Sequence, residues 1–261
     1  MTADPSPSPP LAEGWKLWFY TNYDCNLSCT YCAACSSPRA PRRALAPATV
    51  RQAVDEAAAL GFAELFFTGG EPFILPDIYD MLAYASARLP TTVLTNAMVF
   101  TPARREKLRR VQNPNLRVQV SLDGARPEQH DPYRGAGTWA KTVGGIKQLL
   151  GEGWAVRLST TETPANCDFL AEICAFHLAL GIPESDHFVR PLAKRGFSSA
   201  GMAVDKTTLA PELTINAEGM FWHPLSTDED MRVAAQIFPL ACAVESVRAT
   251  TGAAPAGRAF T

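Results

Sequence analysis

The chain has 261 residues, of which 47% are hydrophobic, and its formal net charge is −2 at pH 7. This length is enough to bury one substantial core. The small negative charge does not favour a polyanionic partner such as a nucleic acid, and no apolar run is long enough to cross a bilayer. Residues 1–14 begin with an acid and several Ser and Pro without an apolar stretch, so we expect a disordered leader rather than a signal peptide.

Short β-rich runs recur along the first 190 residues. Each is three to seven residues long, and most are followed by a segment with helical spacing. The expected strands are Leu17–Tyr23, Glu64–Thr68, Thr92–Thr95, Arg117–Leu122, Val156–Thr160 and Phe188–Arg190.

The segments between these strands carry apolar stripes at helical spacing. The first expected helix carries Val50, Val54 and Ala57 on one face and ends at Gly61, as a glycine cap predicts. A basic helix from about Ala103 is interpreted as a solvated face rather than a nucleic-acid site. Six alternating strand and helix units predict parallel βαβ packing, and therefore an α/β fold that forms a partial, TIM-like (β/α)6 barrel.

After Pro191 the alternation stops. The segments Glu212–Ile215 and Met220–Trp222 flank a turn and predict a hairpin. A last helix is expected over roughly Arg232–Arg248, followed by an Ala- and Gly-rich tail. We therefore expect a leader over 1–14, a core domain over 15–195 and a C-terminal extension over 196–261.

Four of the seven cysteines fall within eleven residues, at Cys25, Cys29, Cys32 and Cys35. Such a cluster favours metal ligation over a disulfide framework, and it suggests a reducing, cytoplasmic location. Three thiolates at the spacing Cys25-x3-Cys29-x2-Cys32 can reach three irons of a cubane and leave the fourth iron open. A zinc knuckle or a redox pair using Cys35 is the alternative, whereas a filler role is favoured for Cys35 itself.

The run Cys25-Asn26-Leu27-Ser28-Cys29-Thr30-Tyr31-Cys32 resembles the signature loop of the radical S-adenosylmethionine (SAM) superfamily. The resemblance implies one [4Fe–4S] cluster on Cys25, Cys29 and Cys32, with Tyr31 near the adenine of SAM. In that family the open iron is chelated by the amino and carboxylate groups of SAM. An electron from the cluster then splits SAM into methionine and a 5′-deoxyadenosyl radical.

The run Thr68-Gly69-Gly70-Glu71-Pro72 closes the second expected strand. Alone it is typical of an ordinary turn. Its place about forty residues after the cysteine loop resembles the family's motif for the SAM amino group, which implies that Gly69, Gly70, Glu71 and Pro72 hold the methionine end.

Polar residues also end the next strands. In parallel α/β folds functional groups collect at this edge of the sheet, and the family places contacts to SAM and substrate there. The resemblance therefore extends to Thr95, Asn96 and Ser121, whereas Asp123 is either a contact or a turn former.

Two arginines and an asparagine complete the candidate set. Arg157 on the fifth strand either points inward, toward the SAM carboxylate or a substrate acid, or faces outward between helices. Asn166 resembles the family's fifth-strand loop, and Arg190 at the end of the sixth strand is a candidate like Arg157.

The resemblance covers about Leu17–Pro191 and is closest to the branch of molybdenum-cofactor enzymes and peptide maturases with cysteine-rich C-terminal extensions. This chain departs from that branch, because Trp222-His223-Pro224 stands where the first auxiliary cysteine is expected and only Cys242 lies downstream. We therefore expect no auxiliary cluster. The hypothesis is hydrogen abstraction from a peptide or small metabolite, with an electron donor such as flavodoxin or ferredoxin. The alternative is a non-catalytic iron–sulfur or zinc module for electron transfer or assembly.

Overall fold

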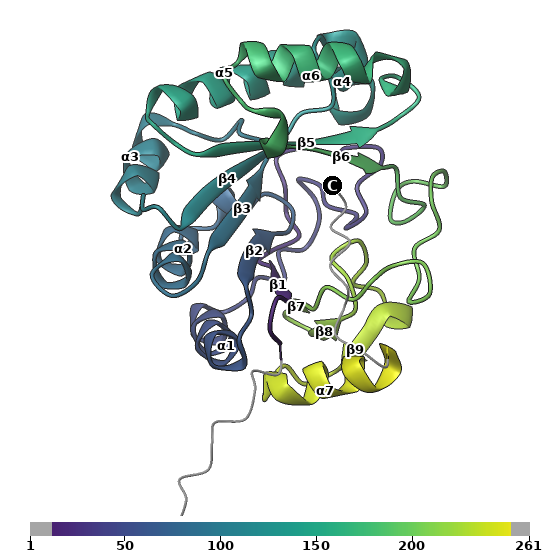
Figure 1. Ribbon diagram of the computed structural model, residues 1–261. Coiled ribbons are helices and arrows are strands. Elements are labelled where there is room, and N and C mark those ends of the chain that lie inside the picture. The colour runs from purple at the N-terminus through teal and green to yellow at the C-terminus, as the bar shows by residue number, and fades with distance from the viewer. Residues whose placement is uncertain (1–11, 252–261) are drawn as a thin grey trace, which may run out of the picture.

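The computed structural model describes residues 12–251, which form one curved sheet with helices on its outer side (Figure 1). The order of strands in the sheet is β6-β5-β4-β3-β2-β1-β7-β8-β9, and the first six strands are parallel to one another. Those six strands are β1 Lys16–Tyr20, β2 Glu64–Thr68, β3 Thr91–Thr95, β4 Leu116–Ser121, β5 Val156–Glu162 and β6 His187–Pro191. The predicted partial (β/α)6 barrel is confirmed.

Alternation within the strands separates two faces of the sheet. In β1, Leu17 and Phe19 are completely buried in the hydrophobic core, and Phe19 stacks on Phe67 of β2 with ring centroids 4.7 Å apart. Trp18 has the opposite orientation and stacks on Phe66 at 4.2 Å. Since side chains alternate with a period of two, one set packs under the helices and the other lines the interior of the barrel.

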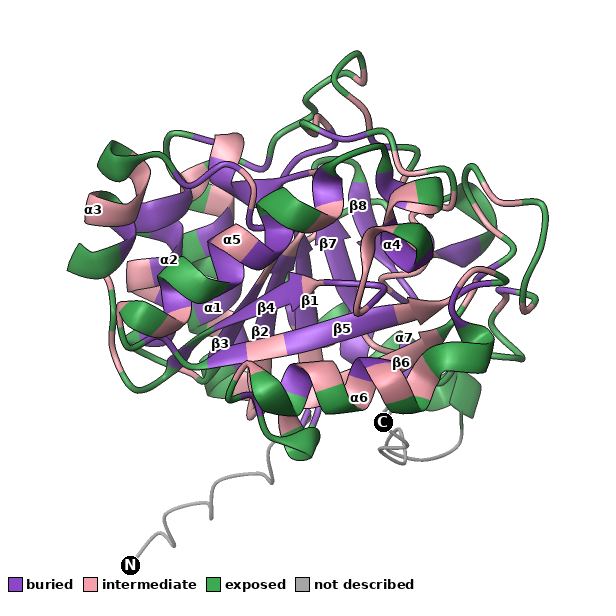
Figure 2. Cartoon of the chain, turned by 90° about the horizontal axis from the view of Figure 1, so that it is seen from above, coloured by how far each residue is buried: buried purple, intermediate pink, exposed green. Residues whose placement is uncertain are grey.

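The helices cover the outer face, and their own outward surfaces are exposed (Figure 2). Helix α1 shows the local reason for its end, because Gly61 adopts a φ of 85° and its N–H bonds to Ala57 and Ala58 carbonyls. The helices are α1 Pro47–Leu60, α2 Ile78–Ser86, α3 Pro102–Arg110, α4 Pro127–Arg134, α5 Thr138–Gly151, α6 Leu170–Ala179 and α7 Leu240–Thr251.

The C-terminal extension belongs to the same sheet. Strand β7 Thr214–Asn216 pairs in parallel with β1, and β8 Gly219–Phe221 returns from it as the predicted hairpin. The expected last helix from Arg232 is wrong at its start: Arg232–Ala234 is strand β9, paired with β8, and α7 begins only at Leu240. Pairing with β8 at the edge of the sheet gives these residues an extended conformation. The spacing of apolar residues in the sequence does not reveal this pairing.

Both chain ends reach beyond the described part. The expected leader and the Ala- and Gly-rich tail lie outside it, apart from residues 12–14. These three form a turn in which Ala12 is completely buried and its N–H bonds to the Leu60 carbonyl at 2.8 Å. Residues 12–14 therefore pack against the end of α1.

Candidate functional site

The carboxyl ends of β1 to β4 meet around a cavity of about 180 Å³. The three cysteines of the first loop line it together with residues that follow β2, β3 and β4, as expected for this edge of a parallel sheet. From the candidate set, the lining residues are Cys25, Cys29, Tyr31, Cys32, Gly69, Gly70, Thr95, Asn96 and Ser121. We call this space the cysteine cavity.

The backbone of the cysteine loop places hydrogen-bond donors beside two of the cysteine sulfur atoms. The Sγ of Cys25 accepts a hydrogen bond from the Leu27 N–H at 3.4 Å, and the Sγ of Cys32 accepts one from the Ser36 N–H at the same distance. Backbone N–H donors of this kind favour a thiolate. Cys35 is exposed and is not among the residues that line the cavity. Three cysteines around one cavity therefore fit a cubane held by three protein sulfurs.

Burial opposes thiolate formation before a metal binds. Burial, together with the nearby Glu71 carboxylate, raises the pKa of Cys25 to about 12. Burial also raises the pKa of Cys29, which the Arg134 guanidinium partly offsets. A cysteine that binds metal must be a deprotonated thiolate. The positive charge of a bound iron centre would offset the cost of burying that negative charge.

Gly69 and Gly70 are required by packing between two loops. A Cβ on Gly70 would lie 2.1 Å from the backbone oxygen of Asp24, and one on Gly69 would lie 2.4 Å from that of Asn22. A carbon atom and an oxygen atom that are not bonded to each other cannot lie this close together. The two glycines thus let the loop after β2 pack directly on the start of the cysteine loop while both line the cavity.

Glu71 is completely buried and does not line the cavity. Its Oε1 accepts hydrogen bonds from the Phe73 N–H at 3.1 Å and the Thr95 hydroxyl at 2.8 Å, and its Oε2 accepts one from the Asn96 N–H at 2.9 Å. Burial raises the pKa of Glu71 to about 7, although the three hydrogen bonds lower it. Glu71 therefore fixes the β3 end, and Pro72 beside it is buried as well.

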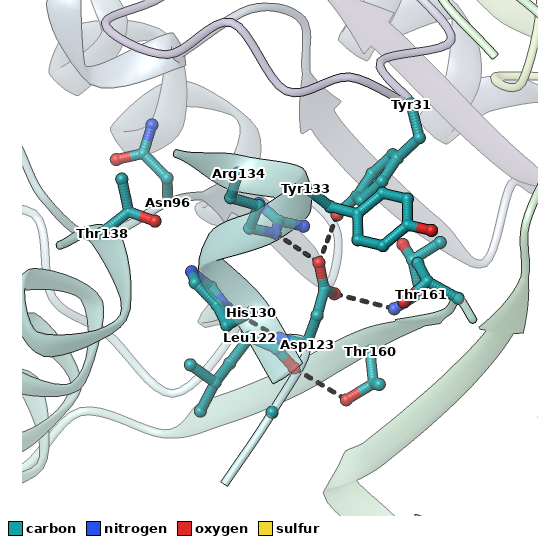
Figure 3. Close-up of polar contacts among 12 residues, drawn as sticks. Tyr31, Asn96, Leu122, Asp123, His130, Tyr133, Arg134, Thr138, Thr160 and Thr161 are labelled. Carbon is teal, nitrogen blue, oxygen red and sulfur yellow. Dashed lines mark hydrogen bonds and ion pairs between the residues drawn. The ribbon is translucent and has the colours of Figure 1, made fainter. Parts of the chain in front are cut away.

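Asp123 forms a buried network behind the cavity (Figure 3). Its Oδ2 accepts from Nε of Arg134 at 2.6 Å and from the Tyr31 hydroxyl at 2.5 Å, and its Oδ1 accepts from the Thr161 N–H at 2.9 Å. Asp123 therefore holds the cysteine loop, α4 and β5 together, and its contact with SAM or substrate stays a prediction.

Sequence reasoning missed Arg134, which lines the cysteine cavity, because it missed the short helix α4. Two signals were present. Pro127 occupies the first turn and Gly135 follows the last residue, which is the usual asymmetry of helix ends.

Asn166 is also a positioning residue. It is completely buried, its Nδ2 donates to the backbone oxygens of Asp123 and Thr161 at 2.8 Å, and its Oδ1 accepts from the Thr163 N–H at 2.7 Å. It does not line the cysteine cavity.

The barrel interior holds a second and larger cavity of about 370 Å³. We call it the barrel cavity. Arg157 and Arg190 both line it, so the inward orientation of Arg157 is the one observed. Arg157 already has partners from this chain: its Nη1 lies 3.2 Å from Oε1 of Glu64 and its Nε lies 3.3 Å from Oδ1 of Asp186.

The two cavities adjoin each other. Four residues line both of them, namely Tyr20, Ala33, Thr68 and Leu94. A group bound in the barrel cavity would therefore lie next to a group bound in the cysteine cavity.

Within residues 12–251, no three His, Cys, Asp or Glu side chains are grouped so that they could hold a single metal ion. None of the helices in the same range has the length and apolar character needed to span a membrane. All seven cysteines lie in this range and all are free.

The fold and the site define a class of protein: a parallel α/β partial barrel with a three-cysteine loop at the carboxyl edge of its sheet. Residues 20–166 match the family model of the radical SAM superfamily. This match covers more than half of the 261 residues, and the chain belongs to that superfamily.

Individual relatives agree with this assignment. The chain is 33% identical over 172 residues to an AdoMet-dependent heme synthase from Methanosarcina barkeri, covering 65% of this chain and 47% of that protein. It is 31% identical over 179 residues to a PqqA peptide cyclase from Ruegeria pomeroyi, covering 68% of this chain and 46% of that protein. The chain thus spans less than half the length of these curated relatives.

A solved structure shares the fold. The crystal structure of Streptococcus suis SuiB bound to S-adenosylmethionine matches with a TM-score of 0.62 at 20% sequence identity, covering 74% of this chain and 44% of that one.

Proposed function

We propose that the chain is a radical SAM enzyme that holds one [4Fe–4S] cluster on Cys25, Cys29 and Cys32. SAM binds in the cysteine cavity, and a peptide or small-molecule substrate binds in the adjoining barrel cavity. The observation that carries the proposal is the convergence of the three cysteines with the ends of β2, β3 and β4 on one cavity. When bound, the cluster and SAM together supply a 5′-deoxyadenosyl radical that takes a hydrogen atom from the substrate.

The chain's own residues position these groups. Gly69 and Gly70 present a backbone edge with no side chain in the cavity wall, and Thr95, Asn96 and Ser121 present polar groups to it. Behind this wall Glu71 fixes the β3 end, and Asp123 fixes Tyr31 through its hydroxyl. The contacts to SAM therefore come from residues whose conformations are set by buried hydrogen bonds, which is the preorganisation that catalysis needs.

The barrel cavity is the proposed site of the substrate C–H bond. Its walls carry the aromatic rings of Trp18, Phe66 and Phe188. Such a space holds a substrate C–H bond close to the neighbouring cavity and shields a radical from solvent.

A peptide is the favoured substrate class, because a PqqA peptide cyclase is among the relatives. We further propose a flavodoxin or ferredoxin as electron donor, since the cluster must be reduced from outside the chain. A cytoplasmic location is proposed because the seven free cysteines suit a reducing compartment.

The test is anaerobic reconstitution with iron and sulfide, followed by SAM and dithionite, with and without a mixture of short peptides. We expect 5′-deoxyadenosine and methionine as products. Cys29→Ala should abolish them, whereas Cys35→Ala should retain most of the activity because Cys35 lies outside the cavity lining.

Two results would contradict the proposal. A fully loaded cluster that yields no 5′-deoxyadenosine under any of these conditions would favour a non-catalytic iron–sulfur module. Stoichiometric zinc in place of iron, or loss of the cluster in Cys35→Ala, would show that the ligand assignment is wrong.

A further inference from the structure

The charged side chains of the barrel cavity are paired with one exception. Lys16 lies 3.3 Å from Oε1 of Glu212, and Arg157 is paired with Glu64 and Asp186. The other oxygen of Glu212 accepts a hydrogen bond from the Trp18 indole N–H at 2.6 Å. The carboxylates in this wall are therefore already held by other groups.

Arg190 is the exception. Its guanidinium makes no hydrogen bond or ion pair with any residue in the described range 12–251, and its Nε is buried without a partner. Burial lowers the pKa of Arg190, and the negative charge of Glu212 offsets part of this effect without a hydrogen bond between the two side chains. A buried Nε without a partner is costly, and an anion placed against the guanidinium of the half-buried Arg190 would relieve that cost.

Aromatic rings lie in the cavity wall around Arg190. They favour a ligand that carries its negative charge on an otherwise apolar group. The adjoining wall contains Phe188 from the same strand and Trp18 and Phe66 from across the barrel. His223 also lines the cavity, and burial lowers its pKa to about 4, so it is neutral near pH 7. The planar guanidinium matches a carboxylate in a two-point hydrogen-bonded geometry.

The carboxylate of SAM is a poor candidate for this role. Arg190 lines the barrel cavity and not the cysteine cavity, where Arg134 is the lining cation. In the radical SAM superfamily the open iron of the cluster binds the SAM carboxylate, and the proposed function places SAM in the cysteine cavity. The partner of Arg190 is then a group on the substrate.

We infer that Arg190 binds a carboxylate of the substrate in the barrel cavity and so selects acids over their neutral amides. This inference rests on the proposed function for the identity of the cavity as the substrate site. The carboxylate comes either from a chain terminus or from an acidic side chain, and the experiment separates these two sources.

The probes are two pairs of small molecules, each pair differing only in charge. N-acetylphenylalanine and its amide test a terminal carboxylate, and N-acetylglutamate α-amide and N-acetylglutamine α-amide test a side-chain carboxylate. Binding to the cluster-loaded protein is measured by calorimetry. We expect the acid of at least one pair to bind about tenfold or more tightly than its amide, and the pair that discriminates identifies the source.

Variants connect this preference to Arg190. Arg190→Gln should remove the preference, Arg190→Lys should keep part of it because the charge remains, and Arg110→Gln on the exposed surface of α3 should keep all of it. If Arg190→Gln does not fold, the wild-type comparison and Arg190→Lys decide the question.

Equal binding of acid and amide in both pairs, or no binding of any probe up to its solubility, overturns the inference. So does a preference that survives in Arg190→Gln. The assay involves no turnover. Failure of wild-type protein to form 5′-deoxyadenosine would therefore count against the proposed function alone, and loss of acid selectivity in a protein that cleaves SAM would count against the role of Arg190 alone.

Discussion

Nε of Arg134 lies 2.6 Å from Oδ2 of Asp123, and both side chains are buried. The same oxygen accepts the hydroxyl of Tyr31, which sits between Cys29 and Cys32. Burial alone would raise the pKa of Asp123, but Arg134 and the hydrogen bonds hold it below its ordinary value. One ion pair therefore connects the end of β4, the helix α4 and the cysteine loop.

Replacement of Arg134 by Met should destabilise the protein strongly. It leaves the Asp123 carboxylate buried without its cation, and removal of one partner of a buried pair costs about 3–5 kcal/mol in the free energy of unfolding. Denaturant unfolding measures this change. Arg126→Met is the matched control, because Arg126 and Glu172 are both substantially exposed and such pairs contribute about 1 kcal/mol or less. Similar losses of unfolding free energy in the two variants would show that the buried ion pair stabilises the protein no more than the exposed one.

Gly70→Ala should displace the cysteine loop. The added Cβ would lie 2.1 Å from the backbone oxygen of Asp24, the residue before Cys25, and overpacking of this kind costs about 1–3 kcal/mol. We expect lower stability and less iron bound per chain after reconstitution.

Gly144→Ala is the control for Gly70→Ala. Gly144 lies in α5, and a Cβ there meets no atom within 4 Å, so the change should be neutral or stabilise the helix by about 0.5–1 kcal/mol. A Gly70→Ala protein that keeps full iron loading and stability would contradict the packing described for these loops.

Glu71→Gln should weaken both stability and SAM binding. The carboxylate receives only donors, from Phe73, Thr95 and Asn96. An amide nitrogen in place of one oxygen faces a donor and leaves it unpaired, at a cost of about 1–3 kcal/mol. Thr95 and Asn96 line the cysteine cavity, so their displacement should lower SAM affinity in equilibrium binding. Glu106→Gln, at a half-exposed position on α3, should leave SAM binding unchanged and cost at most about 1 kcal/mol of stability through its surface ion pairs.

The sequence was sufficient for the parts of the fold that local spacing determines. Six strands and the helices between them, apart from the short α4, follow from periodicity. Parallel pairing then brings Cys29, Gly70 and Ser121 to one cavity although they are far apart in the chain. Strand β9 was missed because its conformation depends on pairing with β8 rather than on its own residues.

The directions in which the side chains point were harder to predict from the sequence than the strands and helices. Glu71 and Asn166 sit one layer behind the cavity. Buried donors surround the Glu71 carboxylate, and the Asn166 amide both donates to and accepts from the backbone. Arg157 and Arg190 point into the other cavity, and which of them finds an internal carboxylate depends on the register of β5 with β6 and on a loop aspartate, Asp186. Such contacts join residues far apart in sequence, and no local pattern encodes them.

The buried His177 should make stability depend on pH below neutrality. It is 1% exposed, its two ring nitrogens have no partner in the described range, and its ring meets that of His187 with centroids 4.1 Å apart. Burial, with a smaller effect of His187, lowers the pKa of His177 to about 3. An unfolded histidine has a pKa near 6.5, so the unfolded state binds the proton first. The contribution of neutral His177 to stability is complete above about pH 6.5 and is lost progressively as the pH falls toward the folded pKa.

His177→Leu should therefore reduce the pH dependence of the free energy of unfolding. Between pH 6.5 and 5, one such group contributes a slope of up to about 1.4 kcal/mol per pH unit. Urea unfolding at several pH values compares the variant with the wild type. Groups remote from His177 contribute equally to both curves, whereas His187, whose ring contacts that of His177, contributes part of the difference. Phe176→Leu, the adjacent change on α6, should lower stability while keeping the wild-type slope, because His177 is still present. A His177→Leu protein with the wild-type slope would mean that His177 is protonated in the folded chain, against the burial observed here.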